Sequence, residues 1–456
     1  MEELKYLLLD MGDSGIFLWD AAAWKDAILR PGGLSVWLNG FLVQFFHLEF
    51  LAPVLALALL AVSVLLTYSL CRKLPAGLFP LTLFPTAFLC LNVLTDSFSF
   101  QAVTDYILVC SIILALFRKP GRLISVIVRI LLACALILAT GPLLRPSCIP
   151  GSHRFIYAAW ASLAVCFAVS CFWGKSGPGK MKAAFVVVLF SISCLAVILP
   201  FHHLLQNNRH SRQEQICRLS FYARGARWKE ILSACRHMNM GNFILLNYAN
   251  LAQSHEGTLI KKYWTSTSSR NDVRALCVAP DKTAGTMSLL SLIYYHVGDI
   301  AAAQDMAFEA GQYRESPSLL QMLVKTNIIF GNYRVAAKYI SRLEKTLFYR
   351  NWASGMRQYL NDDAVWADPE FSSKRKGLPC SDAFIVRNRL MDDLMLLLEA
   401  DPSNAAARDY ALTWLEMSRD ALALEAFVDK FYGSSVLPTL TPDMQAGLLV
   451  AKGGKR

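Results

Sequence analysis

The chain contains 456 residues, of which 55% are hydrophobic, and it carries a formal net charge of +11. Residues 1–201 contribute +5 and residues 202–456 contribute +6, and much of the first share lies in short loops beside apolar segments. Basic residues in such loops reflect orientation in a membrane, so the charge argues against a nucleic-acid-binding protein. We therefore expect an all-α chain, with a membrane domain followed by a domain of ordinary soluble composition.

Residues 1–49 are predicted to form a tail outside the cytoplasm. The chain starts MEELKYLLLDMGDSG, which has no basic region before an apolar run and hence no signal peptide. We expect that an upstream spanning helix is missing from this chain. Within the tail, Leu34–Phe46 is predicted to be an amphipathic helix lying at the membrane surface, because Trp37, Phe41 and Phe45 recur at roughly helical spacing. The alternative is that this segment simply extends the first span.

Residues 50–201 are predicted to form a polytopic bundle of six spanning helices. A span needs about 20 mostly apolar residues, because lipid offers no partner for free backbone groups. The second and third stretches are the shortest, and Pro80 and Pro85 in the second allow a broken helix there. The six stretches are Phe50–Leu70, Gly77–Leu94, Phe100–Phe117, Leu123–Leu144, Phe155–Trp173 and Ala183–Phe201.

The loops between these stretches predict their orientation. Lys and Arg accumulate in cytoplasmic loops. The basic residues lie mainly after the first, third and fifth stretches, whereas Thr95–Ser99 has none and Arg145–Arg154 has only its two terminal arginines. This asymmetry places residues 1–49 and everything after Phe201 outside the cytoplasm. The basic residues on the cytoplasmic side are Arg72, Lys73, Arg118, Lys119, Arg122, Lys175, Lys180 and Lys182.

Two charged residues, Asp105 and Arg129, lie inside the predicted spans. Asp105 is roughly 7 Å from the outer end of its helix, and Arg129 is roughly 9 Å from the inner end of its own, at 1.5 Å per residue. We expect both side chains to reach an interface by snorkelling. The alternative is a polar site inside the bundle, since an intramembrane charge is a functional candidate by default. Their different depths argue against a pair.

Residues 202–456 are predicted to form helical repeats. The segment LLSLIYYHVGDIAAAQDMAFEAG is followed 33 residues later by LQMLVKTNIIFGNYRVAAKYISRL, with Gly298 aligned to Gly331. This period and pattern are typical of tetratricopeptide repeats, in which two antiparallel helices meet at a turn where glycine can adopt positive φ. A weaker unit gives the turn role to Gly225, and a fourth covers Ala405–Phe431. The alternative is a helical bundle without repeats, and Asn361–Pro379 is predicted to be a long polar loop.

One stretch, NIIFGNYRVAAKYISRLEKTLFYRNWA at Asn327–Ala353, resembles the signature of a family of uncharacterised bacterial membrane proteins common in the Bacteroidetes. RPGGLSVWLNGFLVQFF at Arg30–Phe46 and AAQDMAFEA at Ala302–Ala310 support the resemblance, which covers most of the chain. Members have several spans followed by a tetratricopeptide-like region, and they usually begin with one more span. The resemblance implies a bacterial membrane protein and implies no activity. With the orientation that the loops predict, the C-terminal domain lies on the periplasmic side of the inner membrane.

Candidate chemistry is sparse. The chain has no CxxC pair, no phosphate-binding glycine loop and no HExxH motif, so we expect no cofactor and no metal. Cys217 and Cys235 are candidates for a disulfide in an oxidising compartment. Asp10 and Asp13 are weak catalytic candidates, because membrane glycosyltransferases place acidic residues in the first outer loop as metal ligands or general bases. Asp13 can equally belong to an ordinary turn.

Three functions remain open at the level of sequence. The favoured one is a membrane-anchored interaction or scaffold protein, in which the repeat surface binds a protein or peptide partner. The second is a polytopic enzyme that acts on a lipid-linked sugar through Asp10 and Asp13. The third is a transporter or channel component, which is disfavoured because the spans contain few charges and no matched pair of broken helices.

Overall fold

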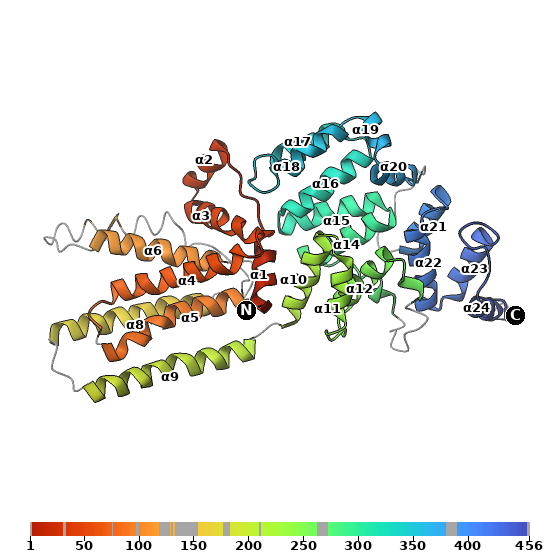
Figure 1. Ribbon diagram of the computed structural model, residues 1–456. Helices are drawn as coiled ribbons and strands as arrows, with labels where there is room; N and C mark the ends of the chain where they lie inside the picture. The colour runs from red at the N-terminus through yellow and green to blue at the C-terminus, as the bar shows by residue number, and fades with distance from the viewer. Residues whose placement is uncertain are drawn as a thin grey trace. The chain divides into compact units, whose positions relative to one another are not determined.

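The computed structural model describes residues 2–30, 33–74, 76–96, 100–117, 128, 131–132, 154–176, 183–208, 211–261, 272–379 and 390–453. Within these ranges every regular element is a helix, and the one strand-like pairing is an isolated bridge between Tyr432 and Leu437. The expected all-α class is therefore confirmed. The chain divides into two units, Met1–Glu214 and Gln215–Arg456, and we describe each by itself (Figure 1).

The first unit begins with three short helices and a 3-10 turn. Gly12 packs against the backbone of the 3-10 turn so closely that an added Cβ would lie 2.8 Å from the His47 nitrogen. The segment predicted to be an amphipathic surface helix forms α3 and this turn, and residues 48–50 separate it from α4. The elements are α1 Glu2–Gly12, α2 Ala21–Leu29, α3 Gly33–Val43 and η1 Gln44–His47.

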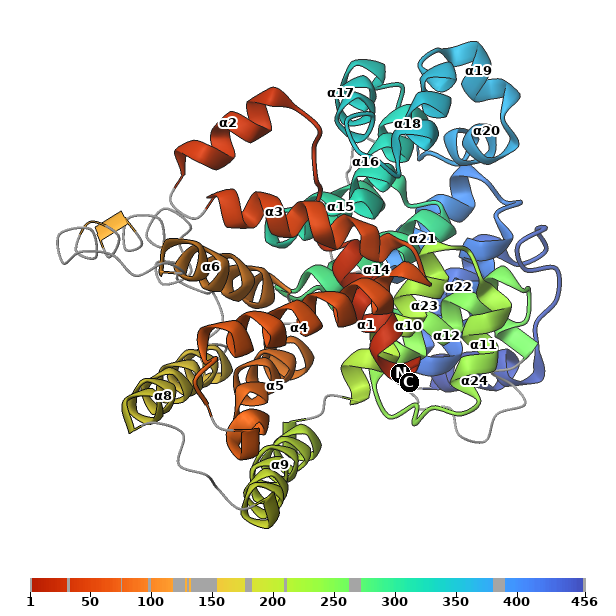
Figure 2. The same cartoon turned by 60° about the vertical axis from the view of Figure 1, so that its left-hand side comes forward.

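The rest of the first unit is built of apolar helices. α4 lies beside α6, and α5 lies beside α8 (Figure 2). In the described residues, three helical segments are long and apolar enough to cross a membrane: Leu51–Leu70, Ala76–Leu94 and Phe185–Leu204. Gln101–Leu116 and Phe155–Ser170 are shorter apolar helices. The fourth predicted span lies almost wholly outside the described residues. The elements are α4 Leu51–Leu70, η2 Ala76–Leu83, α5 Phe84–Leu91, η3 Asn92–Asp96, α6 Gln101–Phe117, α8 Arg154–Ser176 and α9 Ala183–Asn208.

The second predicted span is a broken helix. It starts as the 3-10 helix η2, continues as α5 and ends in the π-helix η3. Pro80 lies inside η2 and Pro85 lies in the first turn of α5, where the missing N–H costs least. The close approach of α9 fixes η2, because Ser193 Oγ donates to the Gly77 carbonyl at 3.0 Å and a Cβ on Gly77 would lie 2.9 Å from Leu189.

The second unit is a chain of short helices, each packed on the next. Side chains cap most helix starts, as Thr283, Asp299 and Ser316 do for α14, α15 and α16. α14, α15, α16 and α17 lie in chain order, each beside the next (Figure 1). The helices are α10 Ser211–Arg224, α11 Trp228–Cys235, α12 Phe243–His255, η4 Val273–Ala275, α14 Ala284–Val297, α15 Ile300–Tyr313, α16 Pro317–Ile329, α17 Tyr333–Leu343, α18 Arg350–Met356, η5 Arg357–Tyr359, α19 Asp362–Ala367, α20 Pro369–Lys376, α21 Leu390–Ala400, α22 Ala405–Ser418, α23 Ala421–Phe431 and α24 Pro442–Gly453.

Two glycines form the turns that the 33-residue period predicted. Gly298 ends α14 with φ 97° and Gly331 follows α16 with φ 77°, so both occupy the left-handed region that a side chain rarely adopts. At the turn between α10 and α11 the residue with positive φ is Ala226, at 52°, and not its neighbour Gly225. The turn role that the sequence assigned to Gly225 therefore falls one residue later, in a residue with a Cβ.

The prediction of a long polar loop at Asn361–Pro379 was wrong, because two short helices fill most of this segment. Asn361 accepts from the Ala364 N–H and starts α19, and Asp368 accepts from the Phe371 N–H and starts α20. Pro369 at the first position of α20 has the φ that a helix start requires. Local capping thus makes helices from a segment too polar to show hydrophobic periodicity.

Candidate functional site

A cavity of about 800 Å³ lies among α15, α16 and α17 in the C-terminal unit. α15 lines one wall from Ala301 to Phe308, while Leu323 of α16 and Val335 of α17 line others. α21 contributes Asp393. A cavity of this volume can take a small molecule or several side chains of a peptide. It is the strongest candidate binding site in the part of the chain that the structure describes.

Large apolar side chains in the lining of this cavity are exposed to solvent. Phe308 is 52% exposed and Val335 is 40% exposed, and both belong to the lining. By contrast, Ala336 and Ile340 of α17 are fully buried in the core. Exposed apolar residues that gather in a concave surface are typical of a binding site, because they gain most from being covered.

One buried carboxyl group, that of Asp393, lines the larger cavity, and it interacts with the buried carboxyl group of Asp299, which is not a lining residue. Asp393 is 4% exposed, and burial, with a further contribution from the charge of Asp299, raises its pKa to about 7. Burial also raises the pKa of Asp299 to about 6, although the Ala302 N–H donates to its Oδ1 at 2.9 Å and opposes the shift. The Oδ2 of Asp299 is buried without a hydrogen-bond partner in the described structure. The site therefore holds acidic groups that an additional cation or donor would stabilise.

A second cavity of about 520 Å³ shares Tyr294 and Pro280 with the first. α21 and α23 line it with Asp392 and Ala423 among others, and the segment before α14 lines it with Cys277. Burial raises the pKa of the Cys277 thiol to about 12, so this group stays protonated and poorly nucleophilic. Tyr294 and Pro280 line both cavities, which we refer to together as the groove.

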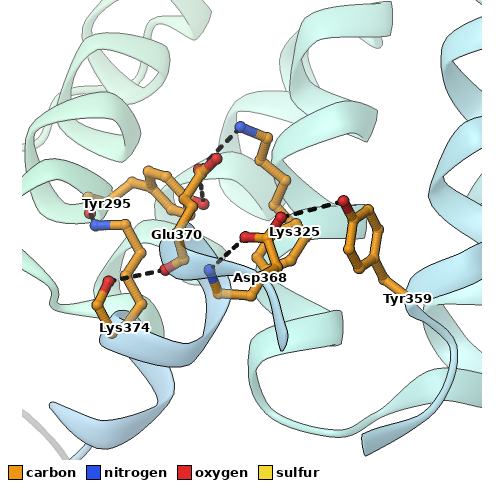
Figure 3. Close-up of polar contacts among 8 residues, drawn as sticks. Tyr295, Lys325, Tyr359, Asp368, Glu370 and Lys374 are labelled. Carbon is orange, nitrogen blue, oxygen red and sulfur yellow. Dashed lines mark hydrogen bonds and ion pairs between the residues drawn. The ribbon is translucent and has the colours of Figure 1, made fainter. Parts of the chain in front are cut away.

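A polar cluster beside the groove ties α20 to α14 and α16 (Figure 3). The Tyr295 hydroxyl donates to Glu370 Oε1 at 2.5 Å, and Lys325 Nζ pairs with the same oxygen at 3.1 Å. Lys374 donates to the Tyr295 carbonyl and lies 4.5 Å from the centre of its ring. Burial lowers the pKa of Lys374 to about 8, against the pull of Glu370. Each polar group has a partner, so we interpret the cluster as a structural brace.

The glycine turns are held by donors from later in the chain. Asn404 Nδ2 donates to the Val297 carbonyl at 2.9 Å, next to Gly298. Arg375 donates to the carbonyls of Ile328 and Ile329, each at 2.9 Å, next to Gly331. Carbonyls at the end of a helix have no partner within it, and these side chains supply one. The walls of the groove are thus fixed at both turns.

Four aromatic rings from four helices of the C-terminal unit contact one another in a row. His255 lies parallel to Trp228 with ring centres 3.8 Å apart, and His296 follows at 3.8 Å. Tyr410 contacts His296 edge-on at 6.2 Å, and Ser254 bonds to the His296 ring at 2.8 Å. Burial and then neighbouring positive charge lower the pKa of His255 to about 4 and of His296 to about 3. Both imidazoles are neutral at pH 7, which favours a packing role.

Asp105 is buried inside the first unit. It is 8% exposed, it accepts a hydrogen bond from Ser35 of α3, and Gln101 Nε2 donates to it at 2.8 Å. Helix α3 packs on α6 and brings Ser35 to a carboxylate 70 residues further along the chain. Two donors satisfy the carboxylate inside the unit, so it has no need to reach the interface. Arg129 lies outside the described residues.

None of the other sequence candidates is among the residues that line the groove. Asp10 belongs to α1, and Asp13 is the first residue after this helix. Both lie in the first unit. Asp13 is only 7% exposed, which leaves little room for a substrate at its carboxylate. The structure has no disulfide between Cys217 and Cys235, and Cys380 lies outside the described residues. Among the described residues, no three His, Cys, Asp or Glu side chains gather as a metal site.

Comparison with known proteins supplies a family. A model described as a family of unknown function, DUF6057, matches residues 3–456. The chain belongs to DUF6057. The expectation of membership in an uncharacterised family is thereby confirmed, while the description of the family says nothing of a membrane, a repeat or a bacterial group. No curated protein and no solved structure matches the chain.

In this DUF6057 chain, sequence analysis did not identify the buried acidic pair of Asp299 and Asp393. Asp299 follows a helix-ending glycine and resembles an ordinary N-cap, which it also is. Asp393 stands in the first turn of α21, where an acidic residue is common. The only available signal was that Asp393 interrupts the apolar face LMDDLMLLL, where leucines surround it at helical spacing.

Proposed function

We propose that this DUF6057 protein is a membrane-anchored interaction protein whose C-terminal helices hold a segment of a partner protein in the groove. In this proposal the first unit is a multi-pass anchor in the inner membrane of a bacterium, and the C-terminal unit lies in the periplasm. The C-terminal helices form tetratricopeptide-like repeats. The partners are the lipid bilayer and a protein or peptide, with no nucleic acid and no cofactor.

The surface of the first unit supports the membrane anchor. The described part of the chain has three helices of sufficient length and apolarity, and large apolar side chains on them point outward. Val187 and Leu199 of α9 are 63% and 61% exposed, and Leu65 of α4 is 63% exposed. Lipid covers such residues favourably, whereas water does not. Aromatic rings crowd α3, where Trp37 packs on Phe17 and Trp24, and such rings favour the membrane–water interface.

The pairing of helices around Gly298 and Gly331 supports repeats. Each glycine lies between two helices that pack on each other, and the two turns are 33 residues apart. Such units stack because none buries its apolar face alone. The fully buried residues Ala303 and Ala336 occupy equivalent positions and permit close approach of the paired helices.

The groove is the single observation that carries the proposal. Its main cavity of about 800 Å³ is lined by exposed Phe308 and Val335 and by polar groups such as Asn327 and Gln304. Repeat proteins bind extended segments in this manner, with apolar contacts for affinity and a few polar groups for orientation. The helices that form its walls end at turns held by Asn404 and Arg375, so the groove is preformed. Binding of a partner segment therefore costs little conformational entropy of the groove.

A matched pair of substitutions tests the proposal. Phe308 and Tyr313 lie on α15 and are 52% and 51% exposed, but only Phe308 lines the cavity. We expect Phe308→Asp to remove a specific protein from complexes isolated from the native membranes, quantified by mass spectrometry, while Tyr313→Asp retains it. Identical partner lists for the wild type and Phe308→Asp, with both variants folded, would contradict the proposal.

The alternative function is glycosyl transfer from a lipid carrier. It rests on Asp10 and Asp13, and the low exposure of Asp13 speaks against it. Turnover of a polyprenyl-phosphate sugar by the purified protein, abolished in Asp13→Asn, would replace the interaction proposal with this one.

A further inference from the structure

Helix α17 carries a row of positive charge on its exposed side. Arg334, Lys338 and Arg342 are exposed and recur every four residues, so they share one face of the helix. Ala336 and Ile340 are fully buried and hold the opposite side of the helix in the core. Like charges at this spacing repel one another, so the row destabilises the helix unless anions compensate it.

The positive charge continues past the end of α17. Residues 333–358 contain six basic residues and one acidic residue, a net charge of +5. The acidic residue is Glu344, and Arg357 donates to its two carboxylate oxygens at 2.6 and 2.7 Å. Arg342 pairs with Glu315, which follows α15, at 2.6 Å. These two ion pairs involve only two of the six cations.

Three of the other cations have no carboxylate partner among the described residues. Arg334 and Lys338 are exposed and form no hydrogen bond or ion pair there. Arg350 donates from Nε to the Glu344 carbonyl at 3.0 Å, and this neutral acceptor leaves its charge uncompensated. Leu347 lies in the turn between α17 and α18 and is 47% exposed. We call Arg334, Lys338, Leu347 and Arg350 the basic face.

The C-terminal unit follows the last apolar helix of the chain almost directly. Helix α9 ends at Asn208, and α10 begins at Ser211. In the proposed function α9 crosses the bilayer, so the chain of the C-terminal unit starts at the lipid surface. Such a short tether gives the lipid headgroups a high effective concentration around this unit.

We propose that the basic face binds the phosphate groups of anionic lipids and docks the C-terminal unit on the bilayer. This inference rests on the membrane anchor of the proposed function. Arginine pairs with phosphate through two parallel hydrogen bonds, and each cation near an anionic surface adds to the attraction. Leu347 enters the headgroup region beside the charges. Val335 and Tyr339 of the same helix line the larger cavity, so docking brings that wall of the groove to the lipid surface.

The absence of the basic face from the groove favours a lipid surface over a discrete ligand. None of its four residues lines either cavity of the groove. A fluid layer of headgroups needs no preformed pocket, because the lipids move to the positions of the charges. The combination of uncompensated cations with an exposed leucine is typical of segments that bind at a membrane surface.

Hydrogen–deuterium exchange of the full-length protein tests the inference. The protein is placed in nanodiscs of phosphatidylcholine alone, or of phosphatidylcholine with about 30% phosphatidylglycerol, which is anionic. We expect exchange of the amides in the turn 344–349 to be at least about 3-fold slower in the anionic discs, because docking suppresses local opening. Exchange in α23 should be equal in the two lipids. About 0.5 M sodium chloride should remove most of the slowing, because salt screens exposed charges.

Two double variants assign the slowing to the basic face. Arg334→Gln with Lys338→Gln should abolish most of it. Arg236→Gln with Lys282→Gln removes the same charge from two exposed residues outside the face and should leave the slowing intact.

Equal exchange of the turn in both lipids would overturn the inference. An unchanged slowing in the first double variant, or an equal loss in both, would overturn it as well. The same slowing produced by soluble glycerol phosphate in phosphatidylcholine discs would identify a site for free phosphate and would also contradict docking on the bilayer. Failure of the proposed function shows separately, as unchanged partners of the Phe308→Asp variant.

Discussion

Asn404 donates a hydrogen bond from Nδ2 to the carbonyl of Val297, 107 residues earlier, at a distance of 2.9 Å. Val297 is the last residue of α14, and its carbonyl precedes the left-handed turn at Gly298. Arg375 does the same for Ile329 before Gly331. The turns at Gly298 and Gly331 are thus each held by a side chain from a later helix or its cap. This bracing fixes the helices that line the groove.

Replacement of Gly298 by alanine is expected to destabilise the protein by about 1–2 kcal/mol. Its φ of 97° is unfavourable for any side chain, and the new Cβ would lie 3.0 Å from Asn404 Nδ2. Gly311 is the matched control, because it lies inside α15 with open space at its Cβ. Gly311→Ala should stabilise by about 0.5–1 kcal/mol. The midpoint of thermal unfolding in detergent measures the stability of both variants. Equal shifts of the midpoint in Gly298→Ala and Gly311→Ala would contradict the left-handed turn at Gly298.

Arg375→Lys is expected to cost about 1–3 kcal/mol although the charge is retained. A lysine cannot bond to the Ile328 and Ile329 carbonyls and to Asp362 at once, as the guanidinium does. The control is Asp362→Asn, whose carboxylate is 69% exposed and contributes little to stability. Unfolding by denaturant should separate the two variants. If Arg375→Lys is as stable as Asp362→Asn, the bracing role is wrong.

Stability should fall as pH rises from about 4 to about 7 because of Asp299 and Asp393. Their pKa values are raised to about 6 and about 7, so the folded protein binds more protons than the unfolded chain above pH 4. Their stabilising contribution is therefore complete below about pH 4 and is lost as they ionise. Asp393→Asn should raise the midpoint of thermal unfolding at pH 8 and change it little at pH 5.

The control for this pH effect is Asp429→Asn. Asp429 is exposed on α23 and should change the midpoint little at either pH. Cys277 and Tyr294 also face the pair, but their raised pKa values keep them neutral below pH 8. A destabilised Asp393→Asn at pH 8 would show that the carboxylate is compensated in the folded protein.

Ser35→Ala is expected to loosen α3 from α6 and to cost about 1–2 kcal/mol, because the buried Asp105 then loses one of its donors. Val36→Ala on the same helix is the control, since Val36 is 49% exposed. If Asp105 reached the interface as the sequence predicted, Ser35→Ala would be neutral. Thermal unfolding in detergent decides between the buried and the snorkelling carboxylate.

Reporter fusions test the orientation of the anchor. Alkaline phosphatase, which is active only outside the cytoplasm, should be active when fused after Asn208 and inactive when fused after Lys73. Green fluorescent protein fused at the same two positions should show the opposite pattern. Fluorescence after Asn208 would place the groove in the cytoplasm and contradict the periplasmic assignment.

The sequence predicted those features that depend on local pattern. Helical periodicity gave the all-α class, and the 33-residue spacing gave the turns at Gly298 and Gly331. It missed features made by distant contacts, such as Ser35 on Asp105 and the proximity of Asp299 to Asp393. It also missed α19 and α20, whose stability comes from N-caps and from the bracing by Arg375 and not from an apolar stripe. Helix caps and long-range hydrogen bonds are difficult to predict from a single sequence, because neither produces a hydrophobic periodicity.

The most direct measurement is photo-crosslinking from inside the groove in living cells. A benzophenone amino acid replaces Phe308, or Tyr313 on the same helix as the control, and illumination is followed by mass spectrometry of the adduct. The account predicts an adduct with a protein segment at position 308, absent at 313. Equal adducts at both positions, or adducts with lipid alone, would contradict the assignment of the groove as the partner-binding site.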